Sequence, residues 1–126
     1  MTQDSFIHFV RLVKRLYNDQ QGAVEKGYGY LGTLKHLEPL AAKVDAQLKL
    51  ISSSQEVFYD WLPKWINLVR EWRSLQKLYL ETEYESQLMK CRDKDRIMDQ
   101  GFNHIKQNST HVLETPQTQQ TLFPQK

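Results

Sequence analysis

The sequence predicts an all-α protein, a small helical bundle with one long C-terminal helix. Three observations carry this prediction. Apolar residues recur at helical spacing near the N-terminus, a second periodic run follows Pro39, and residues 64–100 contain neither glycine nor proline. At 126 residues the chain has the length of one domain, which can bury roughly two-thirds of its unfolded surface.

The first helix is expected from about residue 5 to about residue 20. Asp4 or Ser5 can cap it, and Gly22 is where it should fray. Its apolar residues follow the spacing i, i+3, i+4, i+7, i+10 and i+11, which places them on one face. They are Phe6, Phe9, Val10, Val13, Leu16 and Tyr17.

A glycine-rich segment, Gly27–Gly32, separates this helix from the next. Tyr28 and Tyr30 alternate with the glycines as in a strand, but no second strand is available for pairing. We expect a loop or an irregular helical turn here. Pro39 then suits the first turn of a second helix, which should stop in the serine run at residues 52–54.

The long helix is predicted to run from about residue 60 to residue 99, with Asp60 as its cap. At 1.5 Å per residue it would be roughly 60 Å long. From Gly101 onward the chain is rich in glutamine and threonine and shows little periodicity. We therefore divide the sequence into a helical bundle domain, residues 1–100, and a flexible tail, residues 101–126.

The long helix carries an aromatic stripe. Because a helix advances about 100° per residue, all three tryptophans fall within roughly 40° of one another, with two leucines and a tyrosine beside them. Such a stripe is typical of a core or of a subunit interface. The residues assigned to it are Trp61, Trp65, Leu68, Trp72, Leu75 and Tyr79.

Basic residues lie on the backs of the first and the long helix. If the two helices packed side by side, these cations could form one surface that contacts phosphates without reading sequence. The alternative is that they are ordinary solvated helix backs. The candidate residues for nucleic-acid backbone contact are Arg11, Lys14, Arg15, Arg70, Arg73 and Lys77.

Motifs for metal binding or catalysis are not found in the sequence. The four histidines (His8, His36, His104 and His111) have no zinc-ligand spacing, and Asp93, Asp95 and Asp99 lack the glycine of a calcium loop. The single cysteine, Cys91, lies between two cations that could lower its pKa, but an incidental cysteine is the favoured interpretation. We expect no metal, no cofactor and no enzymatic activity.

The bulk properties indicate a cytoplasmic protein. One cysteine allows no internal disulfide, and the apolar N-terminal run is interrupted by charges, unlike a signal peptide or a membrane span. The net charge of +2 is too small to indicate nucleic-acid binding by itself. A nucleic-acid-binding function would therefore have to be argued from where the basic residues lie on the helices.

In size, helicity and charge placement the chain is similar to the small helical subunits that line the nucleic-acid path in CRISPR effector complexes. That similarity implies a non-catalytic subunit of a nucleoprotein complex, in contact with nucleic-acid backbone and with other protein subunits. The alternative function is a protein–protein adaptor or inhibitor without nucleic-acid contact, which would use the apolar face around Leu88–Met98 or the C-terminal tail. Self-association is a further option, and no membrane contact is expected.

Overall fold

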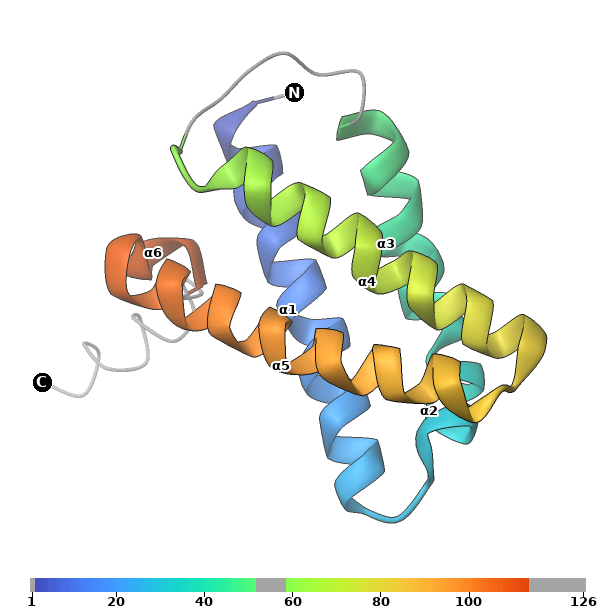
Figure 1. Ribbon diagram of the computed structural model, residues 1–126. Helices are drawn as coiled ribbons and strands as arrows, with labels where there is room; N and C mark the ends of the chain where they lie inside the picture. Colours follow the sequence, from blue (N-terminus) through green and yellow to red (C-terminus); the bar gives the residue numbers. More distant parts are fainter. Residues whose placement is uncertain (1, 52–58, 114–126) are drawn as a thin grey trace, which may run out of the picture.

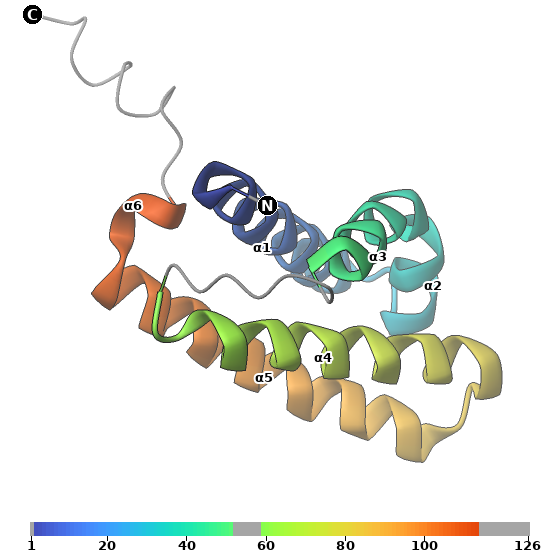
Figure 2. The same ribbon diagram turned by 90° about the horizontal axis from the view of Figure 1, so that it is seen from above.

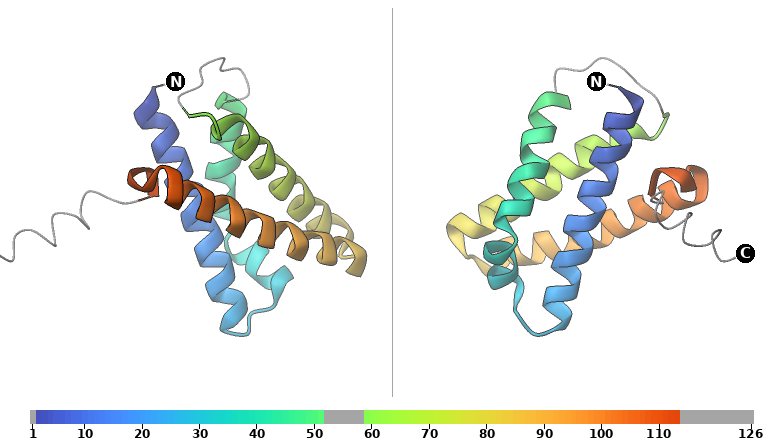
Figure 3. Two further views of the ribbon diagram at one scale, coloured as in Figure 1. Left: turned by 60° about the vertical axis from the view of Figure 1, so that its left-hand side comes forward. Right: turned by 180° about the vertical axis from the view of Figure 1, so that it is seen from behind.

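The computed structural model describes residues 2–51 and 59–113, and these form an all-α bundle, as predicted (Figure 1). The helices make two layers. In the first, α1 and α3 run side by side with α2 between them in sequence; in the second, α4 and α5 form an antiparallel hairpin that crosses them (Figures 2 and 3). The helices are α1 (Gln3–Glu25), α2 (Tyr30–His36), α3 (Glu38–Ile51), α4 (Leu62–Thr82), α5 (Glu85–Asn108) and α6 (Thr110–Leu113).

Helix α1 is longer than predicted at both ends. Thr2 is its N-cap, and the Thr2 hydroxyl accepts a hydrogen bond from the Ser5 backbone N–H at 3.1 Å. At the other end the helix continues past Gly22, where fraying was expected, and stops at Glu25. The predicted apolar face is buried, and Gln20 extends it by one more turn.

The glycine-rich segment is partly loop and partly helix. Gly27 and Gly29 have positive φ angles of 96° and 70°, a conformation that glycine adopts without steric cost, and the chain turns there. Helix α2 begins immediately afterwards at Tyr30, so the described residues contain no strand in this segment. Helix α3 then ends at Ile51; the serine run predicted to stop it lies outside the described residues.

The prediction of one helix over residues 60–99 is wrong, because the chain reverses at residues 83–84. Glu83 adopts the left-handed conformation (φ 55°, ψ 22°), and its backbone N–H donates to the carbonyl of Tyr79 at 2.8 Å. Tyr84 is extended and precedes the first residue of α5. A left-handed glutamate costs about 1 kcal/mol or more, which the packing of α5 along α4 offsets. Asp60 is not the cap either; Trp61 occupies that position, and its side chain makes no capping hydrogen bond to the helix backbone.

The boundary predicted at residue 100 is also wrong. Helix α5 continues to Asn108, and its residues Phe102 and Ile105 are buried in the main core. The short helix α6 then folds back against α1 and buries Val112. Residues 101–113 therefore belong to the bundle, while residues 114–126 of the predicted tail lie outside the described part of the chain.

Two groups of buried apolar residues hold the layers together. The larger one joins α1, α3, α4, α5 and α6; the smaller one contains Tyr30, Leu34, Tyr79 and Cys91, near the α4–α5 turn. Among the described helices, none has the length and hydropathy that a bilayer-spanning segment needs.

Candidate functional site

Helix α4 places the residues assigned to the aromatic stripe at two depths. Trp65, Trp72 and Tyr79 are buried, whereas Trp61, Leu68 and Leu75 are partly buried at the edges of the two cores. The buried face of the helix also includes Leu62, Ile66, Val69, Arg73 and Gln76. It is therefore rotated relative to the predicted stripe, towards the side that carries Arg73.

The basic residues of α1 have separate structural roles. The Arg11 guanidinium donates to the backbone carbonyls of Val112 and His111 at 2.8 and 2.9 Å, which anchors α6 to α1. The Lys14 ammonium lies over the Phe102 ring, 4.5 Å from its centre. Arg15 points to solvent, with only an exposed ion pair to Asp19 at 3.8 Å.

The three cations of α4 also differ. The Arg73 side chain is only 6% exposed and makes two hydrogen bonds to the Asp45 carboxylate, at 3.0 and 3.1 Å. Lys77 contacts the same carboxylate at 3.3 Å but keeps 56% of its side chain in solvent. Arg70 donates to the Asn67 side chain on its own helix. Helices α1 and α4 lie in different layers (Figure 2), not side by side as the merged surface requires.

A buried polar network links Arg73 to four other helices. The Arg73 guanidinium donates to the side-chain oxygen of Gln76 at 2.6 Å. Gln76 is itself fully buried and donates to Gln20 of α1 and to the Tyr30 hydroxyl of α2. Tyr30 and the Trp72 indole N–H both donate to one oxygen of Asp95 on α5, at 3.2 and 2.7 Å.

Burial changes the acidity of the groups in and beside this network. It raises the pKa of the Asp95 carboxyl, an effect that the hydrogen bonds from Trp72 and Tyr30 only partly counter. Desolvation also acts to raise the pKa of Asp45, but Arg73 and Lys77 outweigh it and hold that pKa below its ordinary value. Burial raises the pKa of the Cys91 thiol to about 11, so this cysteine is a packed side chain at neutral pH and not a thiolate nucleophile.

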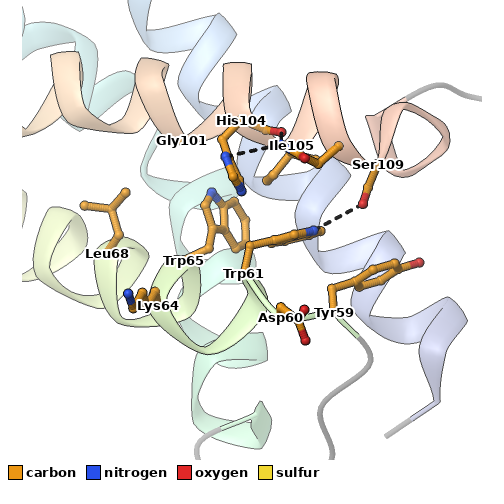
Figure 4. Close-up of a pocket in the computed structure, with 11 residues that line it drawn as sticks. Tyr59, Asp60, Trp61, Lys64, Trp65, Leu68, Gly101, His104, Ile105 and Ser109 are labelled. Carbon is orange, nitrogen blue, oxygen red and sulfur yellow. Dashed lines mark hydrogen bonds between the residues drawn. The ribbon is translucent and has the colours of Figure 1, made fainter.

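A cavity of about 810 Å³ lies between the N-terminal turns of α4 and the C-terminal turns of α5 (Figure 4). We call it the aromatic pocket. Trp61 and Trp65 form its wall with rings at 90° to each other, and Tyr59 stacks on Trp61 at 5.0 Å. The exposed side chains of Lys64 and His104 also line it.

Hydrogen bonds fix one tryptophan of the pocket and leave the other without a partner. The Trp61 indole N–H donates to the Ser109 hydroxyl at 3.2 Å. The Trp65 indole N–H is buried and has no hydrogen-bond partner among the described residues. Gly101 lies directly against it, since a Cβ at this position would be 3.3 Å from the Trp65 ring. The missing side chain of Gly101 thus lets α5 approach the indole closely.

Most of the exposed large apolar side chains among the described residues belong to the α4–α5 hairpin. The described residues include six large apolar side chains with substantial exposure, and four of them belong to this hairpin or its turn. They are Leu78, Tyr84, Met89 and Ile97. The segment Leu88–Met98 named by the adaptor hypothesis therefore presents Met89 and Ile97 to solvent but buries Met98.

Sequence reasoning missed both the network and the pocket, although one signal was available. Cys91, Asp95, Met98, Phe102 and Ile105 repeat at i, i+4, i+7, i+11 and i+14, which is a core stripe with an aspartate inside it. A polar residue in such a stripe indicates a buried hydrogen-bonding group. The sequence contains no such signal for the pocket, because Tyr59 and His104 come to line the same pocket only when the hairpin folds.

The described residues contain no group of three or more histidine, cysteine, aspartate or glutamate side chains placed to hold a metal ion. No protein-family model matches the sequence, and neither a curated protein nor a solved structure matches it.

Proposed function

We propose that the protein is a non-catalytic subunit of a larger assembly and that it binds a partner protein through the outward side of the α4–α5 hairpin. The observation that carries this proposal is the exposure of Met89 and Ile97, which are 52% and 42% exposed on the same helix. Apolar side chains that cluster on a surface favour contact with another protein. The buried charged residues Arg73 and Asp95 and the half-buried Asp45, by contrast, are already engaged in hydrogen bonds within the fold.

The test is a double substitution, Met89→Glu with Ile97→Glu, in the full chain. Both sites are exposed, so the helicity and thermal midpoint of the variant should stay close to those of the unchanged protein. The native size of the assembly in an extract of the source cells is then measured by size-exclusion chromatography. We expect the unchanged chain to elute well above its own mass of 15.0 kDa and the variant to shift towards that mass.

The matched control is Asn103→Glu with Gln107→Glu, which adds the same charges at exposed polar positions of α5. This control should keep the large assembly. The proposal is wrong if the Met89/Ile97 variant assembles as well as the control. Sedimentation of the purified chain at several concentrations separates self-association from binding to another protein.

Nucleic-acid backbone contact is the second candidate function, and two exposed cations and one partly buried cation favour it. Arg15, Arg70 and Lys77 keep solvent-accessible side chains, whereas Arg11 and Arg73 are held by contacts within the fold. Three cations make a smaller footprint than the six predicted from the sequence. Affinity should still fall as salt concentration rises, in proportion to the phosphates contacted.

This candidate is tested by fluorescence anisotropy with labelled single- and double-stranded oligonucleotides over a salt series. Arg15→Glu with Arg70→Glu should weaken binding, whereas Lys35→Glu with Lys43→Glu, at exposed sites on α2 and α3, should change it less. Arg73 must be left intact, because its loss would disrupt the network. Absence of salt-dependent binding by the unchanged chain would exclude this function.

A further inference from the structure

The aromatic pocket has the composition of a ligand site. Its volume of about 810 Å³ lies within the usual range of roughly 300–1,000 Å³ for cavities that hold small molecules. Trp61, Tyr59 and Trp65 supply flat apolar surface, and Trp61 and Tyr59 remain only partly buried although both are large aromatic residues. Such a wall suits a planar ring, which gains dispersion and electrostatic contact from neighbouring aromatic side chains.

A second observation comes from the wall itself. Trp65 is only 4% exposed, and its indole N–H has no hydrogen-bond partner among the described residues. A buried donor without a partner destabilises the protein, and an acceptor atom on a ligand would relieve that cost. The Trp65 ring forms part of the pocket wall (Figure 4), so a small shift of this wall would offer the N–H to an acceptor atom on a ligand ring.

Charge at the mouth of the pocket adds a third constraint. Lys64 of α4 and His104 of α5 are exposed side chains that line the pocket, and both can donate to an anion. Asp60 lies at the same pocket and disfavours a second anionic group near the start of α4. A planar heteroaromatic ring with acceptor atoms and one attached phosphate meets all three constraints.

We propose that the aromatic pocket binds a nucleobase with its attached phosphate, the base against Trp61 and Trp65 and the phosphate beside Lys64 and His104. A nucleobase with an attached phosphate occurs both in a free nucleotide and in a single nucleic-acid strand, so either could be the natural ligand. Single strands commonly bind by stacking bases on aromatic side chains next to cations. This inference is independent of the Met89/Ile97 surface and of Arg15, Arg70 and Lys77.

The three tryptophans provide the experiment, because each gives one indole N–H resonance in a ¹⁵N–¹H correlation spectrum. Single Trp→Phe variants assign the three signals. Adenosine monophosphate, adenosine and a hexadeoxyadenylate strand are the probes. On addition of a binding probe the Trp61 and Trp65 signals should shift, and the Trp72 signal should stay in place because its N–H is held by buried Asp95 at 2.7 Å.

Charge reversal at the mouth tests where the phosphate lies. Lys64→Glu should weaken adenosine monophosphate binding roughly tenfold and adenosine binding much less, since only the former carries the anion. Lys43→Glu, an exposed lysine of α3 away from the pocket, is the control and should leave both unchanged. Tighter binding of the strand than of the nucleotide would identify a single strand as the natural source, and the reverse order would identify a free nucleotide.

The inference is overturned if none of the three probes at millimolar concentration shifts the Trp61 and Trp65 signals. It is equally overturned if all three tryptophan signals move together, because that indicates a general change in the protein. Equal loss of affinity in the Lys64→Glu and Lys43→Glu variants would show non-specific charge attraction and would also contradict it.

Discussion

The two ends of α4 are held by different chemistry. Near its start, Trp65 packs edge-on against Phe9 of α1 and Phe102 of α5, with ring centres 5.8 and 5.9 Å apart. Two turns later, Arg73 and Gln76 face the interior and are fixed by directed hydrogen bonds. Apolar packing tolerates small rotations of a helix, whereas hydrogen bonds to partners on other helices fix its orientation. We therefore expect the aromatic end to contribute more to stability and the polar end to fix the orientation of α4 against its neighbours.

The largest expected effect is at the aromatic end. Phe102→Ala should lower the free energy of unfolding by about 3–5 kcal/mol, because it leaves a cavity beside Trp65, Tyr17 and the Lys14 ammonium. Urea denaturation followed by circular dichroism measures it. Asn103→Ala, the exposed neighbour, should change the free energy of unfolding by less than about 0.5 kcal/mol. Equal effects of the two substitutions would mean that Phe102 is not packed in the core and that residues 101–113 behave as a tail.

The next largest effect is at the polar end. Arg73→Ala should destabilise the protein by about 3 kcal/mol, because it leaves the half-buried Asp45 carboxylate with only the more exposed Lys77. The double variant Asp45→Ala with Arg73→Ala should be destabilised by less than the sum of the two single variants, by roughly 0.5–3 kcal/mol. Strict additivity in this double-mutant cycle would mean that the pair is not coupled.

The same contrast explains which features the sequence could predict. The apolar spacing of α1 and the run after Pro39 predicted two helices and their buried faces, since hydrophobic periodicity follows packing directly. Hydrophobic periodicity could not predict that Arg73 is buried. Its long side chain lies at the edge of the stripe and is buried because Asp45 on another helix neutralises it. Whether a cation at such an edge is solvated or paired depends on a residue far away in the sequence.

The hairpin reversal was hidden for a different reason. Helix ends are usually marked by glycine, asparagine or proline, but here a glutamate adopts the left-handed conformation. The energy for this comes from the packing of α4 on α5, which a local pattern does not contain. A single helix over residues 60–99 extends the phase of α4 into α5, and the buried face of α5 from Cys91 to Ile105 does not follow that phase. The prediction therefore placed Phe102 in a tail and did not contain the aromatic pocket.

Two aspartates at the polar end should respond oppositely to acid. Burial raises the pKa of Asp95, so ionisation of this carboxyl destabilises the folded protein. The stabilising effect of its protonation is complete below the ordinary carboxyl pKa of about 4 and is lost as pH rises through the raised pKa. Asp45 has a lowered pKa despite its partial burial, because of Arg73 and Lys77. Its contribution is present above about pH 4 and is lost as pH falls through the lowered value.

Asparagine substitutions isolate these two contributions. As pH is lowered from 7 towards 4, the unchanged protein should gain stability relative to Asp95→Asn, and below pH 4 it should lose its advantage over Asp45→Asn. The free energy of unfolding of all three proteins, measured by urea denaturation at each pH, gives both differences. Parallel pH profiles for the two variants would contradict the opposite shifts.

The smallest expected effect compares two helical glycines, Gly22 and Gly101. Alanine is favoured over glycine inside a helix by about 1 kcal/mol, and a Cβ at Gly22 meets no atom within 4 Å, so Gly22→Ala should stabilise the protein by up to that amount. At Gly101 the new Cβ would lie 3.3 Å from the Trp65 ring and 3.4 Å from Leu68. The ring must shift slightly towards the aromatic pocket, which cancels most of the gain. Thermal midpoints should therefore rise for Gly22→Ala and change little for Gly101→Ala; an equal rise in both would show that the contact between α5 and Trp65 is looser than the structure places it.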